Sequence, residues 1–596
     1  MPPRPRFPTS MQRRNRAISR YLAATATSTS TESAQDNDGG LHGFRLSRLP
    51  RLTPAGDLGL IAFPDLLHAK PMVSLEHRSL TRALEFAFAS GDAAGAAQGA
   101  LNVAALAESD FLSDAFSHSL FVDELVRKVF RITVEGRSAA VHQAHLLKLL
   151  THPPRDADTL LFRQAVQREL EHSPQLLTAL EKTYSHIVEL TRLFEESSEY
   201  RRLDMPRFRL DLLQQIRGAL LSMRKAFADA ESGLQRLHGY AAHVCEDPGF
   251  EHLCALLNFE EGMAEVDLHL RIGADGRVRT LHINQTRDEG QKPFYQPPWL
   301  RGLTRLWMRL RGYRLGEAEL VERWFDQVYA GIAHVLPCLL QLRGDLEFYL
   351  ANQQFRRYAH EHGLVVSLPA LHPRGAGEAT SLQGLFNPLL LGGTRPPVPC
   401  DLHTTRTHPL RIITGPNSGG KTRLLQAIGL SQLLGQSGAY VPAETARLQL
   451  ASGLFVSLGE EATADQTEGR LGSELLRIRR LFEQAEPGSL VVLDELCSGT
   501  NPSEGEEIFH LVIELLRHLE PEVFITTHFL KFAAELATQA ESLGLAFFQV
   551  ELDGQERPTY QFMPGVATTS LAHRTAERLG VTREQLLDLV RQKNKD

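Results

Sequence analysis

The feature that most constrains this chain is a glycine-rich turn between an apolar run and a helical pattern. The stretch Arg411–Thr422 reads RIITGPNSGGKT, and the spacing G-x-x-x-x-G-K-T runs from Gly415 to Thr422. A strand before such a turn and a helix after it form the context in which the motif binds phosphate groups. Glycines let backbone amides approach phosphate oxygens, and the helix N-terminus adds a partial positive charge. The stretch therefore predicts a phosphate-binding loop for a nucleoside triphosphate.

The residue types within this loop predict separate roles. Lys421 is expected to reach the β- and γ-phosphates, and the Thr422 hydroxyl is expected to hold Mg²⁺. ATP and Mg²⁺ are the expected cofactors. The predicted nucleotide-contacting residues of the loop are Gly415, Pro416, Asn417, Ser418, Gly419, Gly420, Lys421 and Thr422.

Acidic residues follow a second apolar run, Leu490–Glu495, which reads LVVLDE. Four consecutive apolar residues are typical of a buried strand in a parallel sheet. Asp494 then lies at the carboxyl end of this strand, where it can bind Mg²⁺, and Glu495 can polarise the attacking water. Together with the loop, this pair predicts hydrolysis of the nucleotide.

A histidine follows a third apolar run, VFITTH, which ends at His528. Taken alone, a histidine at a strand end is more often structural than catalytic. Here the strand would end at the same sheet edge as Asp494, so His528 can sense the γ-phosphate or orient the water. Glu495, His528 and Lys421 are thus the predicted catalytic residues.

Composition limits the remaining possibilities. With 596 residues the chain is too long for one core, and three or more domains are expected. The sequence contains no uninterrupted apolar run of about 18 residues, so it predicts neither a transmembrane helix nor a membrane partner. Its 5 cysteines show no C-x-x-C spacing, which is typical of a reducing compartment. The net charge of −7 argues against indiscriminate binding of nucleic acid, although local basic patches can still bind it.

The chain divides into predicted segments of different character. Residues 1–40 are rich in arginine and serine and poor in acid, which fits a disordered tail or, less well, an organelle transit peptide. A linker or a short N-terminal segment is expected over 41–77. Residues 78–359 are predominantly helical, with a β-hairpin predicted over Phe259–Glu289. A proline- and glycine-rich stretch over 360–399 predicts a boundary loop. Residues 400–560 alternate strand and helix, which favours a doubly wound sheet, and 561–596 are again helical.

Two arginine clusters are candidates for contact with nucleic acid. Arg301, Arg305 and Arg309 recur every four residues, so a helix would place them on one face, near Trp299 and Trp307. The second cluster consists of Arg201, Arg202, Arg207, Arg209, Arg217, Arg224 and Lys225. Contact with nucleic-acid phosphates and a merely solvated helix face both remain open for these clusters.

Several motifs in a fixed order resemble the MutS family of DNA mismatch-repair ATPases, which have an ABC-class fold. These are TGPNSGGKT, YVPA, LVVLDEL, SGTNPSEG and TTH, and Leu146–Leu170 and Pro564–Leu586 are similar to segments outside the ATPase. The resemblance implies a helical core, lever and clamp, then a P-loop ATPase domain with a C-terminal helix-turn-helix that makes a homodimer. It also implies a role in DNA repair or recombination and a cytoplasmic protein that is nucleoid-associated on DNA.

This sequence departs from the family pattern at three places. The segment before the helical core is too short for the mismatch-reading domain, and we expect none. We also expect no C-terminal nicking domain. The family's Ser-Thr-Phe, which precedes a glutamate and reaches the partner's nucleotide, reads EGRLGSE here, so that Glu474 keeps its place and Ser473 is the substitute candidate. By this resemblance, both Ser473 and Glu474 are expected to contact the nucleotide across the dimer interface.

These features predict an ATP-dependent clamp that recognises branched or distorted DNA through its backbone and shape. The alternative is a nucleotide-switched protein that acts on a ribosome or a protein partner without binding DNA.

Overall fold

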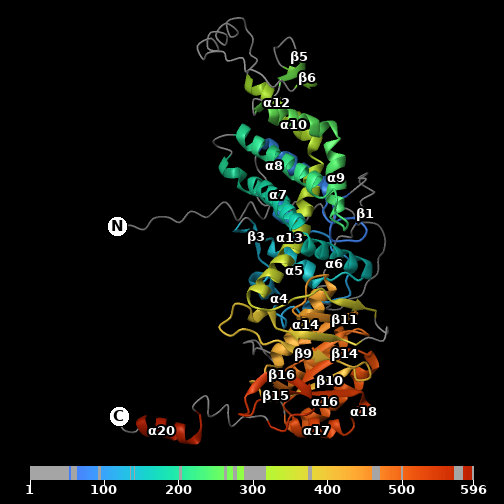
Figure 1. Cartoon of the computed structure of the whole chain (residues 1–596), viewed down its shortest axis with the longest axis vertical. Helices are drawn as coiled ribbons and strands as arrows, with labels where there is room; N and C mark the ends of the chain where they lie inside the picture. The colour runs from blue at the N-terminus through green and yellow to red at the C-terminus, as the bar shows by residue number, and fades with distance from the viewer. Residues whose placement is uncertain are drawn as a thin grey trace, which may run out of the picture. The chain divides into compact units, whose positions relative to one another are not determined.

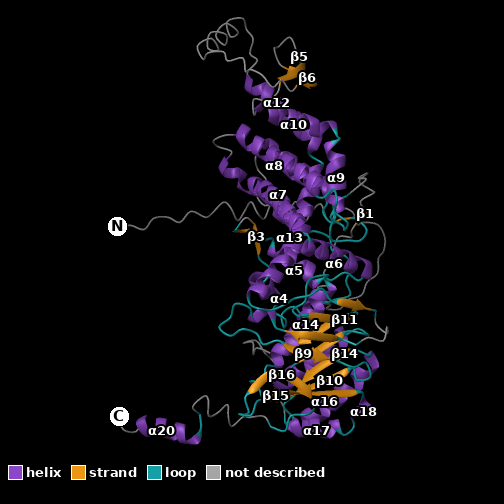
Figure 2. Ribbon diagram, viewed as in Figure 1, coloured by secondary structure: helices purple, strands orange, loops and turns teal. Residues whose placement is uncertain are grey.

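The computed structural model combines helices with β-sheets, which confirms the predicted mixture of α and α/β structure (Figures 1 and 2). It describes residues 53–54, 63–90, 96–134, 136–139, 141–200, 205–260, 265–272, 278–287, 317–373, 379–459, 470–497, 501–569 and 581–593. Among the described helices, none combines the length and the apolar character needed to cross a bilayer.

The N-terminal half of the described chain is mainly helical. Its helices are α2 (His77–Ser90), α3 (Ala96–Asn102), η2 (Ser113–Ala115), α4 (Val122–Lys128), α5 (Gln143–Thr151), α6 (Ala157–His172), α7 (Pro174–Tyr200), α8 (Met205–Ala226), α9 (Gln235–Cys245), α10 (Pro248–Glu260), α12 (Glu317–Ile332) and α13 (Val335–Glu361). Its strands are β1 (Thr53–Pro54), β2 (Met72–Val73), β3 (Ile132–Val134), β4 (Arg137–Ala139), β5 (Glu265–Ile272) and β6 (Val278–Arg287). Antiparallel pairing of β5 with β6 confirms the predicted hairpin.

Helix α13 forms the centre of this helical part. Its 27 residues are buried over most of their length, and α13 packs against α2, α3, α5, α6 and α7 (Figure 1). A buried charge is tolerated only when it is paired, and α13 carries such a pair, Arg343 with Glu347 at 3.1 Å. Arg343 also donates to Thr191 and Glu347 accepts from Tyr184, so both side chains connect α13 to α7.

The segment between residues 63 and 75 packs into the core, so within the predicted linker or short N-terminal segment over 41–77 these residues do not form a linker. Residues 63–68 are buried. The backbone of Leu66 donates to Asp345 at 3.0 Å and accepts from the hydroxyl of Tyr349 at 2.5 Å. Arg236 of α9 donates to the carbonyl of Asp65. Side chains of distant helices thus satisfy the backbone groups that burial would otherwise leave unpaired.

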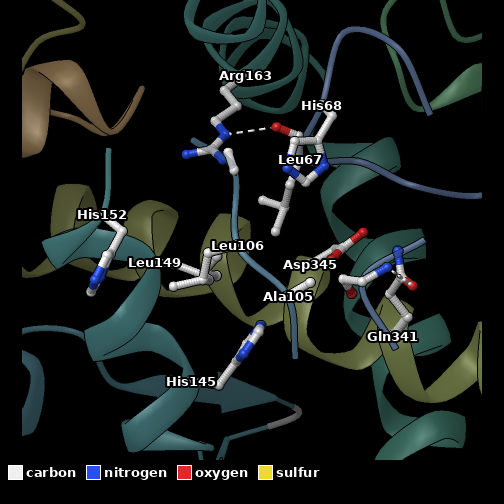
Figure 3. A pocket seen from close by; sticks show the side chains of 12 residues that line it. Leu67, His68, Ala105, Leu106, His145, Leu149, His152, Arg163, Gln341 and Asp345 are labelled. Atoms are coloured by element: carbon white, nitrogen blue, oxygen red, sulfur yellow. Dashed lines mark hydrogen bonds between the residues drawn. The ribbon is translucent and has the colours of Figure 1, made fainter. Parts of the chain in front are cut away.

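Arg163 of α6 joins this buried segment to the C-terminal half of the chain. Its Nε donates to the carbonyl of Leu67 at 2.8 Å, and its Nη1 donates to the carbonyl of Ser437 at 2.9 Å. Figure 3 shows the first bond beside a cavity of about 10 Å³, room for about one water molecule, that His145 and Asp345 also line.

The C-terminal half contains a six-stranded sheet in the order β12-β13-β14-β10-β15-β16, with parallel pairing except at β16. The strands are β10 (Leu410–Thr414), β12 (Leu454–Ser457), β13 (Leu490–Leu493), β14 (Glu522–Thr526), β15 (Leu545–Leu552) and β16 (Pro558–Pro564). The neighbouring helices are α14 (Lys421–Gln436), α15 (Arg470–Gln484), α16 (Pro502–Leu516), η4 (Arg517–Leu519), α17 (Leu530–Ala537), α18 (Ala540–Leu543) and α20 (Arg583–Lys593). Every residue of β10 and β13 is buried, as expected for strands inside a parallel sheet.

A second sheet of four strands lies partly in the predicted boundary loop, residues 360–399. Its order is β7-β11-β8-β9. The strands are β7 (Ala370–His372), β8 (Ser381–Leu385), β9 (Cys400–His403) and β11 (Thr445–Gln449), and η3 (Pro388–Leu390) follows β8. The boundary-loop prediction is therefore wrong for β7 and β8, because both pair with β11, more than sixty residues further along the chain, and β8 also pairs with β9.

Candidate functional site

The glycine-rich loop connects β10 to α14 at the carboxyl edge of the six-stranded sheet. Gly415 has a φ of 138° and Gly420, the N-cap of α14, a φ of 84°, both in a region that side chains disfavour. At Gly419, an added Cβ would lie 2.8 Å from a methyl group of Val550 in β15. Backbone conformation and close packing thus both require the glycines that the sequence supplies.

Lys421 is the first residue of α14 and lies against the loop. Its side chain is buried, and Nζ donates to the carbonyls of Gly415 at 2.9 Å and Pro416 at 3.1 Å. Burial lowers the pKa of Lys421 from its usual range, while Glu495 and Asp494 act in the opposite direction. The amine is therefore held inside the loop, facing two carboxylates.

Thr422 and Asp494 meet where α14 begins and β13 ends. The Thr422 hydroxyl donates to Oδ2 of Asp494 at 2.5 Å, and the Thr526 hydroxyl at the end of β14 donates to Oδ1. Hydroxyl and carboxylate oxygens are the protein ligands that Mg²⁺ prefers, so this pair fits the predicted metal-binding role. The sequence motifs did not identify Thr526 as part of the site. Its position at the end of a predicted strand, two residues before His528, could have indicated it.

Glu495 follows Asp494 in an unusual backbone conformation. Its φ is 48°, its side chain is half-buried, and its amide donates to the Thr526 hydroxyl at 2.8 Å. Two residues later Cys497 has a φ of 63°. Non-glycine residues with positive φ are uncommon and concentrate at functional sites, so the backbone after β13 has the character expected of a catalytic loop.

His528 lies two residues beyond the end of β14, and its side chain is exposed. The imidazole packs on Phe529 with ring centroids 4.3 Å apart. The predicted contact with the γ-phosphate therefore remains a prediction for this residue.

Ser473 and Glu474 lie in the first turns of α15. The side chain of Ser473 falls outside the described residues, whereas Oε2 of Glu474 accepts from the amide of Cys497 in the same chain at 3.0 Å. Arg477, one turn later, is buried and donates to the carbonyls of Ser457 and Asp494. The sequence analysis missed Arg477, because a basic residue in an amphipathic helix carries no functional signal.

An aromatic residue of β16 lies beside the phosphate loop. Tyr560 is 38% exposed and has a φ of 63°. A Cβ added to Gly420 would lie 3.2 Å from its Cδ1. The ring thus borders the N-terminus of α14, a position that the sequence analysis did not identify.

The structure tests only one of the two arginine clusters. Arg301, Arg305 and Arg309 lie outside the described residues, as do Arg201 and Arg202. In the second cluster, Arg207 pairs with Asp211 at 3.3 Å, and Arg209 is buried and pairs with Asp326 at 3.6 Å. Burial beside Asp326 weakens the argument for a DNA contact at Arg209, whereas Arg207, Arg224 and Lys225 are exposed.

Comparison with known proteins gives a consistent set of matches. Residues 411–594 match the family model described as MutS domain V. The similar curated proteins include three named endonuclease MutS2. The relative from Pelotomaculum thermopropionicum is 32% identical over 46% of this chain and 34% of its own length. The relative from Thermus thermophilus is 30% identical over 53% of this chain and 40% of its own length. The relative from Thermomicrobium roseum is 28% identical over 64% of this chain and 48% of its own length. The chain thus spans less than half the length of these three relatives.

Proposed function

Because this chain belongs to the MutS family, we propose that it is a Mg²⁺-dependent ATPase in DNA repair or recombination. The nucleotide cycle would switch a homodimeric clamp between open and closed states on branched or distorted DNA. The observation that carries the proposal is the hydrogen bond between Thr422 and Asp494. It joins the phosphate loop to the acidic strand end, which are the two halves of a nucleotide-hydrolysing site.

The phosphate loop would bind the nucleotide. Backbone amides between Gly415 and Lys421 would bind the phosphates, and Nζ of Lys421 would exchange its carbonyl partners for β- and γ-phosphate oxygens. Thr422 and Asp494 would hold Mg²⁺, which when bound neutralises charge on the phosphate oxygens.

Hydrolysis would depend on Glu495. Its carboxylate accepts a hydrogen bond from the attacking water, which orients the water oxygen towards the γ-phosphorus. A new bond forms between the water oxygen and the γ-phosphorus, and the bond between the γ-phosphorus and the oxygen that bridges it to the β-phosphate breaks. The water proton passes to the carboxylate or to a phosphate oxygen. His528 would sense the γ-phosphate, and Tyr560 would pack against the base or ribose. Ser473 is the proposed contact with the nucleotide of a partner subunit.

DNA would be recognised through its backbone and shape. Contacts to phosphates position a protein on DNA, and the cost of bending the duplex selects structures that are already distorted. Arg301, Arg305 and Arg309 are the proposed contacts. The second candidate is a nucleotide-switched protein that acts on a ribosome or a protein partner; the burial of Arg209 beside Asp326 only removes one possible phosphate contact of the clamp.

ATPase measurements with a panel of DNAs test the proposal and separate the two candidates. The panel contains plain duplex, a mismatched duplex, a fork and a four-way junction, each at two salt concentrations. The proposed clamp predicts that the fork and junction stimulate hydrolysis, and that higher salt weakens the stimulation. Hydrolysis that is indifferent to every DNA, without salt-dependent binding, would overturn the clamp in favour of the second candidate.

A further inference from the structure

The four residues from Asp494 to Cys497 form a backbone segment that needs external support. Glu495 and Cys497 have φ values of 48° and 63°, in the left-handed region. Non-glycine residues remain in that region only where their surroundings hold them there. The carboxylate that orients the attacking water in the proposed function belongs to this segment.

Side chains of helix α15 form hydrogen bonds with the backbone at both ends of the segment. Arg477 donates to the carbonyl of Asp494 at 3.0 Å and also to the carbonyl of Ser457. Glu474 accepts from the amide of Cys497 at 3.0 Å. Glu474 and Arg477 are one turn apart and share a face of α15, so one helix face holds the backbone on either side of Glu495.

We propose that Glu474 and Arg477 are positioning residues for Glu495 and act within their own chain. This inference rests on the proposed ATPase function and assigns Glu474 a role different from contact with a partner's nucleotide. If the hydrogen bonds of either Glu474 or Arg477 to the segment are lost, Glu495 can relax towards an ordinary backbone conformation, and its carboxylate moves away from the water. Lys421 and the phosphate loop belong to other elements and keep their contacts, and the Asp494 side chain stays bound to the hydroxyls of Thr422 and Thr526.

Kinetics of Glu474 variants test the proposal. Glu474→Ala removes the acceptor for the Cys497 amide, whereas Glu474→Gln keeps an oxygen that can accept the same bond. We expect Glu474→Ala to lower the single-turnover rate of ATP hydrolysis about a hundredfold, the effect of a misplacement of roughly 1 Å. Its Kd for ATP should stay unchanged, and Glu474→Gln should restore most of the rate. Glu483→Ala on the same helix is the matched control.

Two results would overturn the assignment of Glu474. If Glu474→Gln is as slow as Glu474→Ala, the negative charge is required and a contact outside the Cys497 amide is responsible. If Kd for ATP rises as much as the rate falls, Glu474 acts in nucleotide binding rather than through Glu495.

Arg477 provides an independent variant pair. Arg477→Ala removes the donor to both carbonyls, and Arg477→Lys keeps one charged donor on a flexible chain. The proposal predicts a large loss of rate for Arg477→Ala, partial recovery for Arg477→Lys and no loss for Arg480→Ala, which changes an exposed arginine of the same helix. Equal rates for Arg477→Ala and the unchanged protein would refute its role.

Hydrogen exchange at the amide of Cys497 separates failure of this proposal from failure of the proposed ATPase. The amide should exchange faster in Glu474→Ala than in the unchanged protein or in Glu474→Gln. If exchange is unaffected by Glu474→Ala, Glu474 does not hold the Cys497 amide and the inference is wrong. If the unchanged protein does not hydrolyse ATP while exchange responds as expected, the hydrogen bond from Cys497 to Glu474 is confirmed. In that case the proposed ATPase function is wrong, and the positioning role that rests on it is wrong too.

Discussion

The hydroxyl of Thr422 donates a hydrogen bond of 2.5 Å to Oδ2 of Asp494, although the two residues are 72 positions apart in sequence. Sheet order explains the contact. Strands β13, β14 and β10 are consecutive and parallel, so the residues that follow them emerge at one edge. Asp494 follows β13, Thr526 ends β14 and the phosphate loop follows β10, and all three meet at that edge.

The first prediction concerns Glu495. Glu495→Gln keeps the size of the side chain but removes the carboxylate that orients water and accepts its proton. We expect unchanged ATP affinity with hydrolysis slowed by about a hundredfold to ten-thousandfold, the usual contribution of general acid–base catalysis. Rapid-quench kinetics with an equilibrium binding assay measure both quantities. Turnover that survives the change would mean that another residue positions the water.

The second prediction concerns the tight packing of the phosphate loop. In Gly419→Ala, the new methyl group would lie 2.8 Å from Val550 and 3.0 Å from the carbonyl of Pro416. The loop must shift, so we expect weaker binding of ATP. Gly554→Ala is the matched control, because a Cβ there has no neighbour within 4 Å. Isothermal titration with ATP compares the two variants, and equal affinities would show that the loop tolerates displacement.

The third prediction concerns stability. Arg163→Ala would leave the buried carbonyls of Leu67 and Ser437 without a donor. An unsatisfied buried polar group costs about 1–3 kcal/mol, so the loss at two carbonyls should lower the free energy of unfolding by roughly 2–6 kcal/mol. The urea midpoint measures this loss, with Arg155→Ala, an exposed arginine paired to Asp110, as control. Similar midpoints for both variants would contradict the role of Arg163 in joining the two halves of the chain.

The fourth prediction concerns DNA. Reversal of Arg301, Arg305 and Arg309 to glutamate should weaken binding to every DNA in the panel and flatten the salt dependence of binding, because each phosphate contact adds about one to the slope. Fluorescence anisotropy at several salt concentrations measures the slope. The control reverses Arg517 and Lys531, which are exposed on the ATPase part of the chain. An unchanged slope would assign the first cluster to a solvated surface.

Local sequence patterns predicted those parts of the fold that depend on neighbouring residues. Strand β10, the loop and α14 follow from one continuous stretch, and the β5–β6 hairpin follows from its alternation of apolar and polar residues. Strands β7 and β8 are short and lie among prolines and glycines; among the described strands β7 pairs with distant β11, and β8 pairs with β11 on one side and with β9 on the other. Tertiary pairing of this kind leaves no trace in a local pattern.

The same reasoning explains the functional residues that the sequence did not predict. Lys421, Thr422 and Asp494 belong to motifs with fixed spacing, so their types could be interpreted before their positions were known. Arg477 and Tyr560 have ordinary local surroundings and matter only because folding brings them to the catalytic segment and the phosphate loop. Glu474 was placed by resemblance in a contact with a partner subunit, whereas its side chain bonds to its own chain at Cys497.

Mg²⁺-dependent ATP hydrolysis by Asp494→Asn shows whether the site formed by Thr422 and Asp494 hydrolyses the nucleotide. The change keeps the shape of the side chain but removes the charge with which Asp494 would bind the metal, while Asp553→Asn alters an aspartate in the β15–β16 hairpin. The account predicts that Asp494→Asn loses hydrolysis at every Mg²⁺ concentration at which the control remains active. Hydrolysis by Asp494→Asn with the rate and Mg²⁺ dependence of the control would show that the nucleotide is hydrolysed elsewhere, and would contradict the account.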